Sequence, residues 1–246
     1  MKRFGRKSFI LLFTLMLLVC SVVASGKSSN TAKAEKLIGY GKTVAIDPGC
    51  QANEDSRKEA LGPGDFKRVK EDLVGTTGVT TDYPEYELNL QVALKLKSVL
   101  EKNGYKVILT RTESDIYATN VDRTMIANTT GADIYVSIHA NDTEDTGVQT
   151  YCMTEDNPYN YGNYGACRLL SDVVVSCLAD ETKADNNGVI ETDKIVGINW
   201  CSIPNTVVGI GSLENEEEEA LLVTDEYQSK IATGIAAGID SYFTQK

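Results

Sequence analysis

Three residues of this sequence carry side chains that bind transition metals, and each follows a segment that could fix its position. His139 is the only histidine and comes directly after an apolar run. Glu85 follows Pro84, and Cys50 follows the turn-forming residues 47–49. An imidazole, a carboxylate and a thiolate are all zinc ligands, whereas Cys50 with His139 alone would suit nucleophilic catalysis. A lone histidine and a helix-start glutamate are also common structural residues, so the pattern by itself leaves these roles open.

The elements that must position these residues alternate between strands and helices. Short apolar runs bounded by turn residues predict strands, and apolar residues at helical spacing predict helices. The predicted order is a strand at 43–46, a helix from 84, a strand at 105–110, a helix at 121–129, strands at 133–138 and 148–151, a helix at 165–178, a strand at 206–210 and a helix at 227–242. Residues 54–82 lack periodicity and predict a long loop beside the site. The alternation indicates an α/β fold with a mainly parallel, twisted sheet of about six strands and helices on both faces.

Ligands of open parallel sheets bind at the carboxyl ends of the strands. The strands at 43–46, 133–138 and 206–210 therefore matter most, since Cys50 and His139 follow the first two of them. These three strand ends should form one site.

Five blocks of the sequence resemble, in order and spacing, the zinc-dependent N-acetylmuramoyl-L-alanine amidases of bacterial cell walls. The blocks are Ile46-Asp47-Pro48-Gly49, then Glu85-Tyr86-Glu87-Leu88-Asn89-Leu90, then Arg123 with Ala127-Asn128, then Ser137-Ile138-His139-Ala140-Asn141, and finally 204–222, where Gly211, Asn215 and Glu218 match. A single block is a weak signal, but five in one order indicate the fold over residues 43–243. The resemblance implies a peptidoglycan hydrolase that uses zinc to cut the amide between the muramoyl lactyl group and L-alanine.

The sequence departs from that family at two catalytic positions. The family holds zinc with a histidine after Asp-Pro-Gly, the helix-start glutamate and the Ser-Ile-His histidine. Glu85 and His139 match, but position 50 is a cysteine. Because cysteine is also a zinc ligand, Cys50, Glu85 and His139 remain the expected metal site. With a thiolate in place of an imidazole, the zinc ion and its three ligands would together be formally neutral, so this site would lower the pKa of a bound water less. The family's general-base glutamate corresponds to Gly209 here.

The loss of the base predicts impaired or lost turnover, because a positioned general base typically supplies about 10²–10⁴-fold in rate. Glu214, a few residues after Gly209, could replace it, although an acidic run is usually solvated surface. The resemblance also places Arg123 and Asn141 in the substrate cleft. Three functions stay open: an impaired amidase, a catalytically dead wall-binding or regulatory module that uses the same cleft, and an unrelated ligand in that cleft. The sequence alone does not decide whether the chain is an enzyme.

The N-terminus has the layout of a signal peptide. Four basic residues precede an uncharged stretch at 9–24, and small and polar residues follow. This stretch is shorter than the roughly 20 residues that span a bilayer. We therefore expect a signal peptide at 1–24, a polar linker at 25–39 and one domain at 40–246. The protein should be secreted, extracellular or associated with the cell wall, with membrane retention and lipidation at Cys20 as the open alternatives.

Charge and cysteine content limit the partners and the covalent framework. Removal of residues 1–24 takes away four basic residues and no acidic one, so the formal net charge changes from −11 to −15. Such a surface disfavours nucleic acid and anionic lipid but allows a glycopeptide partner. Of the remaining cysteines, Cys152 and Cys201 are the expected disulfide, since both should lie near strand ends in an oxidising compartment. Cys167 and Cys177 should share one helix, too far apart for a bridge.

Overall fold

The computed structural model describes residues 37–246, apart from 71–72, 142, 144 and 160–161. The expected signal peptide at 1–24 lies outside the described residues. So do residues 25–36 of the expected linker at 25–39. Among the helices of the described part, none combines the length and the apolar character needed to cross a membrane.

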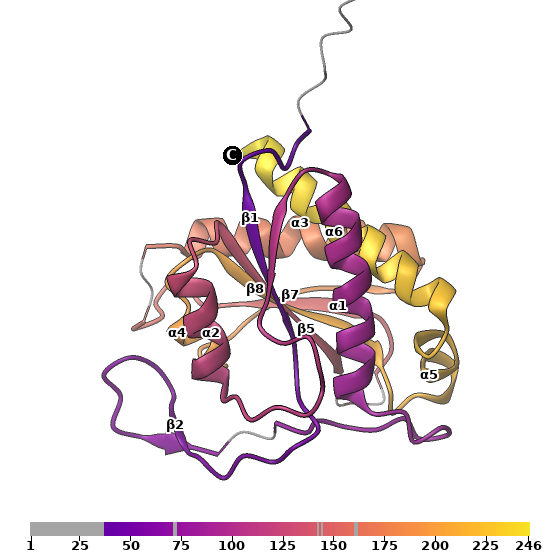
Figure 1. The fold of residues 1–246 in the computed structure, drawn as a ribbon, viewed down its shortest axis with the longest axis horizontal. Helices are drawn as coiled ribbons and strands as arrows, with labels where there is room; N and C mark the ends of the chain where they lie inside the picture. The colour runs from indigo at the N-terminus through magenta and orange to yellow at the C-terminus, as the bar shows by residue number, and fades with distance from the viewer. Residues whose placement is uncertain (1–36, 71–72, 142, 144, 160–161) are drawn as a thin grey trace, which may run out of the picture. The chain divides into compact units, whose positions relative to one another are not determined.

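A six-stranded sheet forms the centre of the domain (Figure 1). Its strands are β1 (Thr43–Pro48), β4 (Lys106–Leu109), β5 (Ile134–Asn141), β6 (Val148–Cys152), β7 (Asn186–Glu191) and β8 (Asn205–Ser212), in the spatial order β4-β1-β5-β8-β6-β7. The first four strands in this order are parallel, whereas β6 pairs antiparallel with β8 and parallel with β7. The mainly parallel α/β sheet is thus confirmed. The reversed β6–β7 pair at one side was not predicted, because β7 is polar and half-exposed and shows no apolar run.

Helices cover both faces of the sheet, as predicted. One face carries α1 (Glu85–Lys102), α3 (Tyr164–Thr182) and α6 (Asp225–Gln245), and the other carries α2 (Asn120–Thr129) and α4 (Val196–Trp200), while α5 (Glu216–Leu222) follows β8. Figure 1 shows α2 and α4 side by side, on the other side of the sheet from α1 and α6. Pro84 is the N-cap of α1, where its fixed φ suits a helix start.

Alternation along the strands decides which residues enter which layer. In β5, Ile134, Val136 and Ile138 belong to the large core beneath α1, α3 and α6, whereas Tyr135 packs in a smaller cluster toward α2. Successive side chains of a strand point to opposite faces, so His139 lies on the α2–α4 face with Tyr135. This face is only partly covered, and the functional site lies there.

The described cysteines are all free, which makes the expected Cys152–Cys201 disulfide wrong. The two residues belong to different clusters: Cys152 packs with Met153 and Cys167, and Cys201 packs with residues of β1, α2 and β5. Both thiols are completely buried and behave as small apolar groups. Cys167 and Cys177 share α3, as expected.

The segment at 54–82 is more ordered than predicted. It contains a two-stranded antiparallel hairpin of β2 (Glu59–Ala60) and β3 (Arg68–Val69), and an isolated bridge joins Thr77 to Pro84. Strands of two residues are too short for a period to be visible in the sequence.

Candidate metal centre

Cys50, Glu85 and His139 converge at the carboxyl ends of β1 and β5, with Glu85 entering from the first turn of α1. Their ligand atoms all lie within 4.8 Å of one another. His139 Nδ1 lies 3.8 Å from Cys50 Sγ and 3.1 Å from Glu85 Oε1. A tetrahedral zinc ion, with Zn–S of about 2.3 Å and Zn–N of about 2.0 Å, would separate sulfur from nitrogen by about 3.6 Å and nitrogen from oxygen by about 3.3 Å. The three donor atoms therefore fit a metal ion in both chemistry and spacing.

The Glu85 carboxylate is oriented by donors on several sides. Its Oε1 accepts hydrogen bonds from the Ala140 N–H at 3.2 Å and from Asn89 Nδ2 at 3.1 Å, and its Oε2 accepts one from the Thr76 N–H at 3.1 Å. Burial alone would raise the pKa of Glu85, but the contact with His139 and these donors lower it. The carboxylate is thus charged and fixed, as a ligand requires.

Cys50 is held in an unfavourable backbone conformation. Its φ of 61° lies in the left-handed region, which is uncommon for residues other than glycine. Such strain persists only where surrounding contacts impose it, and it is frequent at functional sites. Burial raises the pKa of the Cys50 thiol, against the opposing effect of His139, so a cation that binds there must displace the thiol proton.

Two glycines allow the backbone to approach the centre closely. A Cβ at Gly49 would overlap the His139 imidazole. A Cβ at Gly75, where φ is 76°, would lie 2.6 Å from Cys50 Sγ and would overlap the Glu85 carboxylate. Only glycine fits at these two positions, and the loop that carries Gly75 lies directly against the donor atoms.

Arg123, which the resemblance places in the substrate cleft, is buried beneath the turn of Cys50 and is not among the residues that line this cleft. Its side chain is 1% exposed, and its guanidinium donates to Asp47 Oδ1 at 3.1 Å, Pro48 O at 3.0 Å, Cys50 O at 2.8 Å and Gln51 Oε1 at 2.9 Å. Burial alone would raise the pKa of Asp47, but Arg123 and neighbouring hydroxyl groups hold it at about 2. Arg123 therefore fixes the turn that presents Cys50.

The donor atoms open into a cleft of about 700 Å³ on the α2–α4 face. One wall is the loop of Leu73, Gly75 and Thr76 with Glu214, and the opposite wall is Asn120 with residues 194–197. The floor comes from alternate residues of β1, β5 and β8, namely Asp47, Tyr135, Ser137, His139, Val207 and Gly209. The three predicted strand ends thus form one site.

Gly209 lies beside His139, its register partner across the β5–β8 pair. A Cβ at Gly209 would overlap Asn141 Oδ1 and lie 3.1 Å from Gln149 Cγ. Asn141 is held there, because its Nδ2 donates to Gly147 O at 3.0 Å and its Oδ1 accepts from Gln149 Nε2 at 3.3 Å. The space that a side chain at position 209 would enter is therefore filled by a carboxamide. Asn141 lines the cleft, as expected.

Glu214 also lines the cleft. In the acidic run that follows it, Glu216 and Glu217 are exposed, whereas Glu218 is partly buried and Glu219 is buried. Glu214 Oε1 accepts a hydrogen bond from Thr76 Oγ1 at 3.3 Å. Thr76 is the residue whose N–H holds Glu85. Glu214 is thus linked through one residue to a candidate metal ligand.

Residues 44–241 match the sequence profile of the N-acetylmuramoyl-L-alanine amidases. The chain belongs to this amidase family. The Bacillus subtilis protein YqiI is 30% identical over 207 residues, which are 83% of this chain and 86% of that protein. An N-acetylmuramoyl-L-alanine amidase from Clostridium difficile 630 has a similar structure, with a TM-score of 0.67 at 28% identity, covering 83% of this chain and 98% of that one. The amidase Ami1 from Mycobacterium smegmatis shares the fold, with a TM-score of 0.75 at 24% identity over 85% and 99% of the two chains. The resemblance recognised in the sequence is confirmed.

Several residues of the amidase cleft escaped the sequence analysis. Thr76 and Gly75 come from the aperiodic segment, and Lys194 precedes a helix of only five residues. Asn89 could have been found, since it stands four residues after Glu85 and therefore on the same face of α1. The others have no local signal, because only the fold brings them to the cleft.

Proposed function

We propose that this protein is an exported, peptidoglycan-directed member of the amidase family that binds zinc through Cys50, Glu85 and His139. We further propose that it hydrolyses the amide between the muramoyl lactyl group and L-alanine weakly or not at all. One observation supports the second part: position 209, where the resemblance expects the family's general base, is a glycine, and Asn141 Oδ1 occupies the space that a side chain there would enter. The N-terminal pattern of basic, apolar and then polar residues supports export.

The cleft retains what is needed to bind a glycopeptide and to stabilise charge, but it lacks a base at the family position. When bound, zinc would polarise the scissile carbonyl and lower the pKa of a water molecule. Of the described carboxylates in the lining, Asp47 is paired with Arg123 and Glu85 is a ligand. Glu214 is the one left to accept a proton from an attacking water.

A wall-binding module without turnover is the alternative function that the same observation favours. Both functions need a cleft that binds peptidoglycan, and they differ only in whether peptide stems are released. Binding and release must therefore be measured separately on the same samples.

The test incubates the purified chain with insoluble peptidoglycan and added zinc, and measures co-sedimentation, released stem peptides and bound metal. We expect one zinc per chain, binding to the wall, and release far below that of an ordinary amidase. Any residual release should disappear in Glu214→Gln and persist in Glu217→Gln, a matched change of an exposed acid in the same run. Rapid release would refute the impaired site, and absence of zinc together with absence of wall binding would refute the proposed function.

A further inference from the structure

The β2–β3 hairpin, residues 59–69, is firmly attached to the rim of the cleft. The Glu59 carboxylate accepts hydrogen bonds from the Asn120 N–H at 3.1 Å and the Val121 N–H at 2.6 Å, at the start of α2. Trp200 Nε1 donates to Ala60 O at 2.8 Å, next to the end of α4. The hairpin is thereby fixed to the two helices that form one side of the site.

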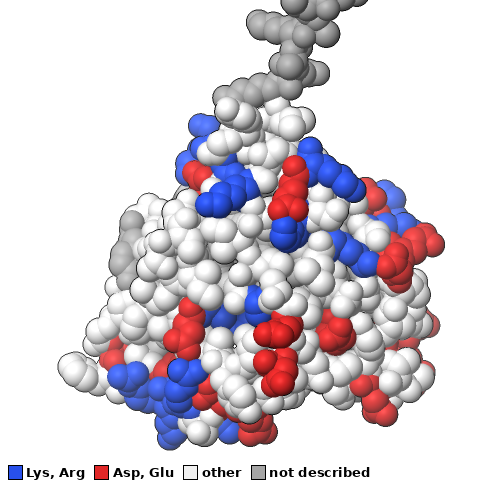
Figure 2. Space-filling model, viewed as in Figure 1, with Lys and Arg blue, Asp and Glu red and all other residues white. Residues whose placement is uncertain are grey.

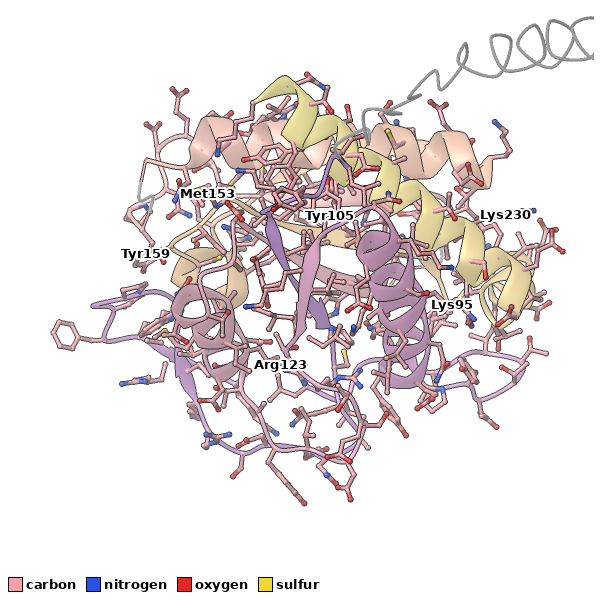
Figure 3. All side chains as sticks on the ribbon, turned by 45° about the horizontal axis from the view of Figure 1, so that its top comes forward. Lys95, Tyr105, Arg123, Met153, Tyr159 and Lys230 are labelled. Atoms are coloured by element: carbon pink, nitrogen blue, oxygen red, sulfur yellow. The ribbon has the colours of Figure 1, made fainter. Side chains whose placement is uncertain are left out.

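The hairpin is also held from its other side. Tyr159, labelled in Figure 3, packs its ring against Gly62, where a Cβ would lie 2.5 Å from ring atoms. The Tyr159 hydroxyl donates to Asp65 Oδ2 at 2.8 Å, and Asp65 Oδ1 accepts from the Lys67 N–H at 2.8 Å. These contacts therefore hold the turn at the tip of the hairpin in a defined conformation.

The supports of the hairpin are themselves part of the cleft. Asn120, whose N–H binds Glu59, lines the wall, and the wall continues through residues 194–197 at the start of α4. A polymer that enters the cleft and extends past this wall would next meet the hairpin. Residues of the hairpin do not line the cleft, so they cannot contact the scissile amide.

The chemistry of the hairpin surface differs from that of the rest of the protein. Phe66 at its tip is 99% exposed. Lys58, Lys67, Arg68 and Lys70 are exposed, and within the described part of the chain none of the four has an ion-pair partner. Figure 2 shows Lys and Arg atoms gathered at the lower left, where Figure 1 places this hairpin. The chain as a whole has a net charge of −11, so this local group of cations contrasts with the overall charge.

We infer that the β2–β3 hairpin is a second binding surface for peptidoglycan, one that contacts the glycan strand and its carboxylate-bearing stem peptides beyond the scissile unit. This inference rests on the proposed function, because it takes peptidoglycan as the polymer in the cleft. Phe66 supplies an exposed ring that can cover the apolar face of a sugar, and exposed aromatic and Arg residues are the usual anchors of binding surfaces. The cations complement stem carboxylates, and charge complementarity of this kind favours association with the matching partner.

The test compares binding of the purified chain to insoluble peptidoglycan stripped of other wall polymers and to a single soluble muropeptide. The variants are Phe66→Ala and the pair Lys67→Gln with Arg68→Gln. The control pair Lys102→Gln with Lys106→Gln removes two exposed cations outside the hairpin, at the end of α1 and the start of β4. Urea unfolding curves check that every variant is folded.

We expect each hairpin variant to bind the polymer about tenfold more weakly, with muropeptide affinity changed less than about twofold. Added salt should weaken polymer binding of the unmodified chain and should have less effect on the Lys67–Arg68 pair variant. The control pair should bind like the unmodified chain.

Two results would overturn the inference while the proposed function stands. In the first, the unmodified chain binds the wall and the hairpin variants bind it equally well. In the second, wall binding is unchanged, and the variants instead lose binding to vesicles of anionic phosphatidylglycerol, which would assign the hairpin to a membrane surface. Failure of the unmodified chain to bind either wall or muropeptide would refute the proposed function, and this inference with it.

Discussion

Replacement of Gly209 by alanine tests directly how tightly Asn141 packs against this position of the cleft. The new methyl group would overlap Asn141 Oδ1, so the carboxamide must rotate away. Rotation breaks its two hydrogen bonds, to Gly147 O and from Gln149 Nε2. At about 1 kcal/mol each, the expected loss in the free energy of unfolding is about 2 kcal/mol.

A double-mutant cycle isolates this contact. Asn141→Ala alone should also cost about 2 kcal/mol, because the same two bonds are lost. In the double variant Gly209→Ala with Asn141→Ala, the methyl group enters space that the shorter residue 141 has left free. The double variant should therefore lose about 1–2 kcal/mol less stability than the sum of the two single losses. Gly165→Ala is the matched control, because a Cβ there meets nothing within 4 Å. It should leave stability unchanged or raise it.

Urea unfolding followed by the fluorescence of Trp200, the single tryptophan, measures the unmodified chain and all four variants. Additive losses, within about 0.5 kcal/mol, would refute the reasoning that Asn141 fills the space that a side chain at position 209 would need. The same reasoning has a functional consequence. The pair Cys50→His with Gly209→Glu should restore little turnover while Asn141 remains, and more when Asn141→Gly is added. Full restoration by the pair alone would contradict the packing argument.

Three further predictions concern the groups around the centre. Since the pKa of Asp47 is lowered to about 2 in the folded state, its contribution of about 2 kcal/mol is present above pH of about 4 and is lost as the pH falls toward about 2. Stability measured over this range should fall less steeply in Asp47→Asn. Arg123→Met should cost about 3–5 kcal/mol in urea unfolding, because it leaves a buried carboxylate unpaired; a loss below about 1 kcal/mol would contradict the role assigned to that ion pair. Asn89→Ala should weaken zinc binding by about 10–100-fold in a competition titration with a chelator, since it removes a partner that orients Glu85, and unchanged affinity would argue against that role.

Much of the architecture was predictable because it follows from periodic patterns. The strands that hold Ile46, Ile138 and Ile210 are buried apolar runs, and a buried strand of a parallel sheet needs such a run on both faces. The reversed β7 strand and the short β2–β3 hairpin have no such run, so local sequence could not reveal them.

The sequence by itself predicted the family, the three candidate donor residues and the two departures, because residue type and order along the chain are enough to define each of them, and the comparisons confirm the family. Only the tertiary structure decided which of the remaining residues reach the cleft. Arg123 and Asn141 came from the same resemblance, yet one is buried beneath the β1 turn and the other lines the cleft. Glu214 stands two residues before the exposed acids Glu216 and Glu217, yet it turns inward to Thr76. The direction of a side chain depends on elements packed from distant parts of the sequence, and this packing is what a linear pattern does not contain.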